Sequence, residues 1–252
     1  MYFIYKKLFL FLYLLLFPFL VVSHHKIDNP TIKFSESPEI RNIFFEWRGH
    51  LNLDRKKNNH ETYHQVLEFG KGWNERYETD LEIHIADLKN SSLAIPTIKF
   101  QNKYNFIKKQ NFLFSTFFSY NLATENNDAD QIEYKFLFQN KFKHLIINNG
   151  FGFYKNINGS KSKNTVLKYF PLIFFKEPIF SDVYLALAGS SNFGKISKFN
   201  TYTNQKHQYG FGFKKTFQKG TRQSFDLTLA YLKGLNSSSF DQSLIWYFNK
   251  SF

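Results

Sequence analysis

Four groups that can exchange protons or bind metal stand at alternate positions: Glu78, Asp80, Glu82 and His84. In a β-strand alternate side chains point to one face, and successive ones stand about 6.5–7 Å apart. That spacing is too wide for one tetrahedral metal ion unless a neighbouring strand adds ligands. The run therefore predicts the charged face of a strand, and we expect no bound metal, no cofactor and no catalytic residue.

Further charged side chains alternate with apolar ones in the same way, and together they form the set that we predict to line an interior. Its acidic part lies in the first three predicted strands and its basic part in the fourth, sixth and tenth. A closed sheet would bring these walls face to face across a narrow bore, where their field would orient a polar solute. The alternative is a filled interior in which the same groups pair as salt bridges. The predicted lining residues are Glu46, Arg48, His50, Glu68, Glu78, Asp80, Glu82, His84, Lys99, Lys103, Lys135 and Lys214.

Signs of a nucleophile or a phosphate site are weak. A lipid-hydrolysing enzyme needs a lipid-facing serine beside a histidine, and no motif marks Ser115, Ser119, Ser224 or Ser243. The Gly-Phe-Gly runs at 150–152 and 210–212 lie inside predicted strands, where glycine more often marks close packing than a phosphate loop. We therefore expect a protein that is not an enzyme.

The elements that carry these residues are strands, because apolar and polar residues alternate from Ile43 onward. Short connections alternate with longer ones rich in Asn, Ser and Gly, as in outer-membrane barrels. Small residues such as Gly150, Ala186 and Ala230 on the polar side favour a barrel interior over the wet face of a soluble β-sandwich, which is the alternative fold. Twelve strands are predicted, near 43–53, 61–70, 76–87, 95–106, 111–122, 131–141, 143–154, 165–175, 182–192, 205–217, 223–233 and 242–252.

Aromatic residues gather at the predicted short-turn ends, as in the girdle of a membrane barrel. This predicted girdle consists of Phe69, Trp73, Tyr77, Phe106, Phe112, Phe142, Phe174, Phe217 and Phe225.

Composition narrows the protein class further. The 252 residues include 33 Phe, 15 Tyr and 3 Trp but no Cys, and the net charge is +13. The lack of Cys excludes a disulfide scaffold and a thiol nucleophile. A mean hydropathy of −0.39 without a long apolar run beyond the N-terminus excludes a multi-helix membrane protein. A soluble core could hardly bury this many aromatic side chains, so many of them must face another apolar environment. The positive charge has two explanations, contact with phosphates or a Lys-rich residue usage.

The chain ends carry export and assembly signals. Residues 1–23 resemble a signal peptide, with Lys6-Lys7, an apolar run over 8–22 and cleavage after Ser23. Residues 24–42 form a polar periplasmic lead-in, and 43–252 form the barrel. The last strand ends on Phe252, preceded by Phe248, Trp246 and Leu244 at alternate positions, which resembles the terminal assembly signal of outer-membrane proteins; Lys250 departs from it.

Two stretches resemble the meta-pathway phenol-degradation family of outer-membrane transporters. One is Leu67–Gly70 followed by Arg76-Tyr77-Glu78. The other is Glu133–Lys135 with Asn140-Lys141-Phe142 and then Asn148–Phe153. The resemblance spans about residues 45–155 and implies an outer-membrane barrel that passes small solutes; it transfers no catalytic residue.

We therefore expect an all-β protein, a single antiparallel barrel of about twelve strands in the outer membrane of a Gram-negative bacterium. The leading hypothesis is a narrow passive channel or transporter for small solutes. The alternatives are an outer-membrane lipid-modifying enzyme and a closed structural or adhesive barrel. Expected partners are membrane lipids, the barrel-assembly machinery and small solutes, but no nucleic acid. Lipopolysaccharide phosphates would meet Arg55, Lys56, Lys57, Lys161 and Lys163 in the outer loops.

Overall fold

The computed structural model describes residues 39–54, 62–87, 93–124, 129–158, 164–219 and 223–252. The predicted signal peptide and most of the predicted lead-in lie outside the described residues, as do Arg55, Lys56, Lys57, Lys161 and Lys163. Within the described ranges, no helix is long and apolar enough to cross a membrane.

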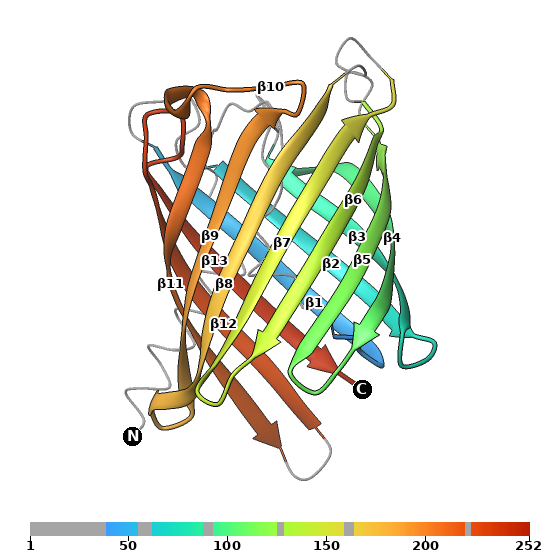
Figure 1. Ribbon diagram of the computed structural model, residues 1–252, viewed down its shortest axis with the longest axis vertical. Helices are drawn as coiled ribbons and strands as arrows, with labels where there is room; N and C mark the ends of the chain where they lie inside the picture. Colours follow the sequence, from blue (N-terminus) through green and yellow to red (C-terminus); the bar gives the residue numbers. More distant parts are fainter. Residues whose placement is uncertain (1–38, 55–61, 88–92, 125–128, 159–163, 220–222) are drawn as a thin grey trace.

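Twelve long antiparallel strands close into a barrel, as predicted (Figure 1). A two-residue strand, β10 (Lys198–Phe199), and the 3-10 turn η1 (Tyr202–Asn204) belong to one long connection. The long strands are β1 (Ile43–Leu53), β2 (Thr62–Gly72), β3 (Tyr77–Asp87), β4 (Leu93–Lys108), β5 (Phe112–Ala123), β6 (Gln131–Lys141), β7 (Leu145–Asn156), β8 (Thr165–Phe180), β9 (Val183–Lys195), β11 (Lys206–Lys219), β12 (Gln223–Gly234) and β13 (Gln242–Ser251).

The first and last strands close the ring in an unbroken register. β1 pairs with β13 from Phe44 opposite Ser251 to Leu53 opposite Gln242. One hydrogen bond beyond the ladder, from the Phe252 N–H to the Ile43 carbonyl at 2.8 Å, extends the closure. The sheet is therefore a single closed layer, which excludes the stacked sheets of a β-sandwich.

The ladder between β8 and β9 is more irregular than the β3–β4 and β4–β5 ladders, which each have one register shift. Its register shifts at three places, two of them flanking Pro178. Proline lacks the N–H that a ladder needs, so a break there follows from the sequence. The turn that follows holds Ser181 and Asp182 at positive φ angles of 34° and 63°.

The barrel is polar inside and apolar outside. On β4 and β5, for example, Phe100 is 53% exposed and Phe118 is 44% exposed, whereas Gln101 and Phe117 beside them are buried. Side chains on the buried face are largely charged or small, and those on the exposed face are largely aromatic or aliphatic. A soluble protein has the opposite arrangement, so the outer surface suits contact with hydrocarbon.

Most of the predicted aromatic girdle lies on the outer surface near the short connections. Phe69, Trp73, Phe106 and Phe142 are all about half exposed there. Phe174 was assigned to this girdle wrongly. It lies against buried residues of the interior, because β8 is apolar on both faces and its alternation does not show which face is inner.

Candidate functional site

The interior-facing side chains of β1–β6 form a continuous charged surface, here called the polar wall. Alternation on each strand turns the predicted lining residues of these strands inward, and all but His84 are buried. The His84 side chain is 15% exposed. The inward placement agrees with the predicted lining set, whereas a role in conduction stays a prediction.

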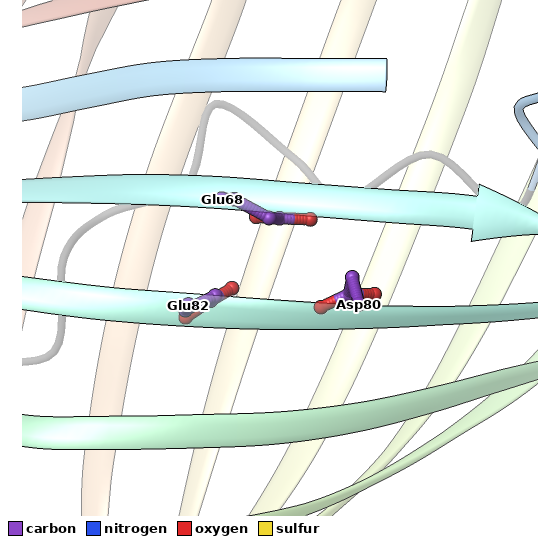
Figure 2. A group of neighbouring side chains, drawn as sticks. All are labelled: Glu68, Asp80 and Glu82. Atoms are coloured by element: carbon purple, nitrogen blue, oxygen red, sulfur yellow. The ribbon is translucent and has the colours of Figure 1, made fainter. Parts of the chain in front are cut away.

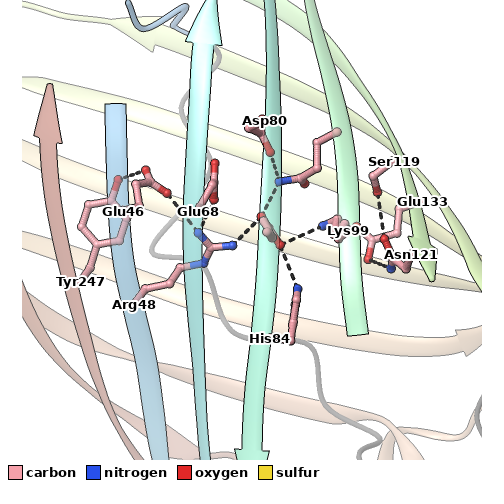
Figure 3. A network of polar contacts seen from close by, with 12 residues as sticks. Glu46, Arg48, Glu68, Asp80, His84, Lys99, Ser119, Asn121, Glu133 and Tyr247 are labelled. Atoms are coloured by element: carbon pink, nitrogen blue, oxygen red, sulfur yellow. Dashed lines mark hydrogen bonds and ion pairs between the residues drawn. The ribbon is translucent and has the colours of Figure 1, made fainter. Parts of the chain in front are cut away.

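Arg48 is the centre of the polar wall (Figure 3). From β1 its guanidinium reaches Glu46 at 3.1 Å and Glu82 on β3 at 2.5 Å, and it also pairs with Glu68 on β2. The Arg48 side chain is only 2% exposed. The planar fork of arginine suits several carboxylates at once, so one side chain ties three strands together.

A second arginine enters this cluster from outside the strands. Arg41, just before β1, pairs with Glu78 at 2.8 Å and Glu68 at 3.1 Å, and also with Glu46. Burial acts to lower the pKa of Arg41, but these carboxylates outweigh it and hold that pKa well above its ordinary value. Arg41 belongs to the predicted lead-in, and no sequence pattern indicates its role, because its contacts depend on where the chain turns into the barrel.

The acidic and basic walls do not oppose each other across the bore, contrary to our expectation. Glu78 stands opposite Lys103 and Glu82 opposite Lys99 on the adjacent strands β3 and β4. The Lys103 Nζ lies 2.8 Å from the Glu78 carboxylate, and Lys99 lies 3.6 Å from that of Glu82. The bases are thus beside the acids, and the predicted transverse field is largely neutralised by pairing within one wall.

The basic end of the wall extends the same network. The Glu133 carboxylate on β6 receives Lys99 at 2.8 Å and Lys135 at 3.0 Å, and Asn121 of β5 donates to it at 2.8 Å. A chain of contacts therefore runs from β1 to β6 (Figure 3). Lys214 lies elsewhere, on β11, where it pairs with Asp226 at 2.8 Å and is 34% exposed.

Three carboxylates of the polar wall come close enough to hold a cation. Oxygens of Glu68, Asp80 and Glu82 lie within 4.8 Å of one another (Figure 2). The alternate residues of β3 stand too far apart to bind one metal ion by themselves, and Glu68 on the neighbouring strand β2 adds the third carboxylate. Arg48 pairs with both glutamates, and Gln101 donates to Asp80 and Glu82. Protein donors thus already contact all three carboxylates, and Arg48 offsets part of their charge.

Three histidines lie together at the end of the polar wall where β1 and β3 end and β2 begins. His50 stands opposite His64 in the β1–β2 register, and their ring centres are 5.4 Å apart. His84 on β3 follows, with its ring centre 5.1 Å from that of His64. The Nδ1 of His84 lies 3.2 Å from the Nε2 of His64, and the Nε2 of His84 lies 3.0 Å from the Glu82 carboxylate.

The other side of the interior carries an apolar surface, here called the apolar wall, formed by Leu172, Ala186, Ala188, Ala230, Leu232 and Ile245. Small residues there agree with the predicted inward alanines. Lys168 adds an inner cation on β8 that the sequence analysis missed, because the run around it is apolar on both faces. Its Nζ lies 3.9 Å from the centre of the Tyr154 ring. Within the described ranges no carboxylate lies at ion-pair distance from it.

Three of the four candidate nucleophiles face the interior of the barrel. Ser115, Ser119 and Ser243 are buried on the interior face and donate to Asn105, Asn121 and Asn52, respectively. The side chain of Ser224 lies outside the described residues. The three described serines thus lack the lipid-facing geometry that a lipid-hydrolysing enzyme needs.

In the predicted terminal signal, Leu244 is 44% exposed and Phe252 is 67% exposed. Trp246 faces outward too, but it is buried because it covers Gly49 and stacks on Tyr63 at 5.5 Å. A Cβ at Gly49 would lie 2.4 Å from the Trp246 ring, so only glycine allows this close approach. The function of these residues in assembly stays a prediction.

Solved structures similar to this chain include outer-membrane porins and channels. The chain is similar to the KdgM porin, at 8% identity and a TM-score of 0.56, covering 83% of this chain and 99% of that one. The NanC porin is similar at 12% identity and a TM-score of 0.55, covering 82% of this chain and 98% of that one. The COG4313 outer-membrane channel from Pseudomonas putida F1 is similar at 9% identity and a TM-score of 0.56, covering 90% of this chain and 100% of that one.

No protein-family model and no curated protein matches the sequence. At these identities the likeness shows the fold, an outer-membrane type of β-barrel. The resemblance to the meta-pathway phenol-degradation family stays a prediction.

Proposed function

We propose that the protein is an outer-membrane channel that lets small solutes pass along its narrow interior without a chemical step. The observation that carries this proposal is the inverted barrel, with an apolar outside and a charged inside. In a bilayer every backbone polar group needs a partner, and a closed barrel supplies all of them. A polar inner wall then offers a solute a path that hydrocarbon does not.

The likeness to porins and the resemblance to meta-pathway transporters support the same proposal. We further propose export through a signal peptide cleaved after Ser23 and insertion in the outer membrane by the assembly machinery. That machinery would recognise Leu244, Trp246, Phe248 and Phe252. Lipopolysaccharide phosphates would contact the basic outer loops.

One specific observation favours a closed barrel as the second candidate. The charged residues of the polar wall are paired and buried, as expected where side chains fill an interior. In that case the network holds the wall in place and conducts nothing. Since buried pairs also occur beside open pores, conductance is the property that separates the two candidates.

Planar-bilayer recording of the refolded protein tests the proposal directly. We expect discrete, voltage-independent conductance steps from protein that also shifts its gel mobility on boiling, the sign of a folded barrel. Folded protein that gives no conductance would refute the channel and favour the closed barrel. Enrichment in outer-membrane fractions tests the location separately.

Reversal potentials in a salt gradient test the role of the interior charges. Lys168→Gln removes an inner cation without a carboxylate partner in the described chain, so we expect a shift toward cation selectivity. Asp80→Asn removes an inner anion and shifts selectivity toward anions. The matched control is Lys176→Gln, an exposed residue at the end of β8. Equal potentials for all three variants would refute a selectivity role for the wall.

A further inference from the structure

We propose that His50, His64 and His84 form a binding site for a borderline transition-metal ion, Zn²⁺, Cu²⁺ or Ni²⁺, inside the barrel. Imidazole is the side chain that these ions prefer among nitrogen ligands. The three histidines are a different ligand set from the three-carboxylate group, although Glu82 belongs to that group and also contacts His84. It also goes beyond the channel proposal, since a closed barrel would hold it equally well.

Distances within two of the three imidazole pairs, His50–His64 and His64–His84, match those around one tetrahedral ion. With metal–nitrogen bonds of about 2.0–2.1 Å, two donor nitrogens stand about 3.3 Å apart and their ring centres about 5.2 Å apart. The Nδ1 of His84 and the Nε2 of His64 lie 3.2 Å apart. The ring centres are 5.1 Å apart for that pair and 5.4 Å apart for His50 and His64.

The second nitrogen of His84 is held in the way that metal-binding histidines usually are. Its Nε2 lies 3.0 Å from Glu82, a carboxylate on the same strand. A proton on that nitrogen donates to the carboxylate and leaves the lone pair of Nδ1 directed at His64. Carboxylate–histidine–metal triads set the tautomer of a ligand in this manner. Glu82 is therefore a positioning residue for the site.

His50 supplies an independent sign of a missing partner. Its side chain is 4% exposed, and its Nδ1 accepts or donates no hydrogen bond within the described chain. A buried polar atom without a partner costs about 1–3 kcal/mol and calls for an explanation. A rotation of the ring toward the His64–His84 pair would make it the third ligand. The fourth position is then left for water.

The affinity for an ion here comes from the imidazoles and not from the surrounding charge. Glu82 also pairs with Arg48 at 2.5 Å and with Lys99 at 3.6 Å, so its charge is already shared with two cations. The imidazoles themselves are neutral ligands. We therefore expect the selectivity to follow the order of imidazole affinity, with Cu²⁺ bound more tightly than Zn²⁺, and Mg²⁺ not bound.

Two complementary variants of the full mature chain test the site. In the first, the five histidines outside the cluster become glutamine: His24, His25, His60, His144 and His207. In the second, these five remain and His50, His64 and His84 become glutamine. Both are purified folded in detergent, checked by the mobility shift on boiling, and titrated with Cu²⁺ and then Zn²⁺.

The first variant is expected to bind one equivalent of Cu²⁺ with nitrogen hyperfine structure in its electron paramagnetic resonance spectrum, and Zn²⁺ is expected to compete. The second variant should lack this signal. Single changes His50→Gln, His64→Gln and His84→Gln in the first variant should each weaken binding at least about tenfold. Equal binding by the second variant, absence of the signal from the folded first variant, or unchanged affinity in His50→Gln would overturn the three-histidine site. None of these readouts depends on conductance.

Discussion

Replacing Arg48 by methionine is expected to destabilise the barrel strongly. Methionine fills a similar volume but removes the cation that three carboxylates share across β1, β2 and β3. Glu46, Glu68 and Glu82 are all almost fully buried, so water cannot replace the guanidinium. Arg41 still reaches two of them, but Glu82 loses its arginine.

The size of the effect follows from the geometry. Each ion pair with charge centres about 4 Å apart is worth about 4 kcal/mol at an effective dielectric constant of 20. The cost of burying the ions offsets much of that sum. What remains after removal of one partner is typically about 3–5 kcal/mol. Arg48→Met leaves Glu82 without an arginine while Arg41 still pairs with Glu46 and Glu68, so we expect a loss within that range. Arg48→Lys keeps the charge but loses the fork, so it should cost roughly half as much.

Urea unfolding in detergent micelles, followed by tryptophan fluorescence, measures these differences. The matched control is Lys108→Met, which removes an exposed pair with Glu75 and should leave the midpoint unchanged. Adding Glu82→Gln to Arg48→Met removes one orphaned charge and should restore part of the loss. If Arg48→Met unfolds at the same urea concentration as the parent, the buried network does not stabilise this fold, and our reasoning about the polar wall is wrong.

Three more substitutions test other surfaces of the barrel. Gly49→Ala forces a Cβ to 2.7 Å from the His64 carbonyl and against the Trp246 ring. We expect the free energy of unfolding to fall by about 1–3 kcal/mol and the near-ultraviolet circular dichroism spectrum to change. An unaltered spectrum and an unaltered urea midpoint would contradict the close packing. Phe118→Arg places a cation midway along the outer face of β5 and should cost about 2–4 kcal/mol when unfolding is measured in lipid vesicles. The same change at Phe106, near a short connection, should cost only about 0–1 kcal/mol, and equal costs would argue against a bilayer around the strands.

Alternation predicted the strands well, because it records which face of each strand is apolar and turned outward. β1 and β6 have the predicted bounds, and the inward set on β1–β6 follows from parity alone. β8 was less tractable, since both its faces are apolar. There the pattern misplaced Phe174 and hid Lys168, although the strand itself was expected.

The sequence pattern could not predict which interior side chains pair with one another. The pairing of Glu78 with Lys103 depends on the β3–β4 register, and a shift of one residue would turn every side chain to the other face. The alignment of His50 with His64 depends on the β1–β2 register in the same way. Arg41 required knowledge of how the chain enters the barrel, which alternation does not contain.

The closure between β1 and β13 makes the two ends of the chain depend on each other. Hydrogen bonds from Ser243 to Asn52 and from Tyr247 to Glu46 join residues 191 and 201 positions apart. Contacts of such long range form late and make folding slow. Until the last strand pairs, the polar wall lacks Tyr247, and β1 and β12 each have an unpaired edge. Unpaired amides are expensive in a bilayer, so a copy of this chain without its last strand would be an unstable open sheet and not a smaller barrel.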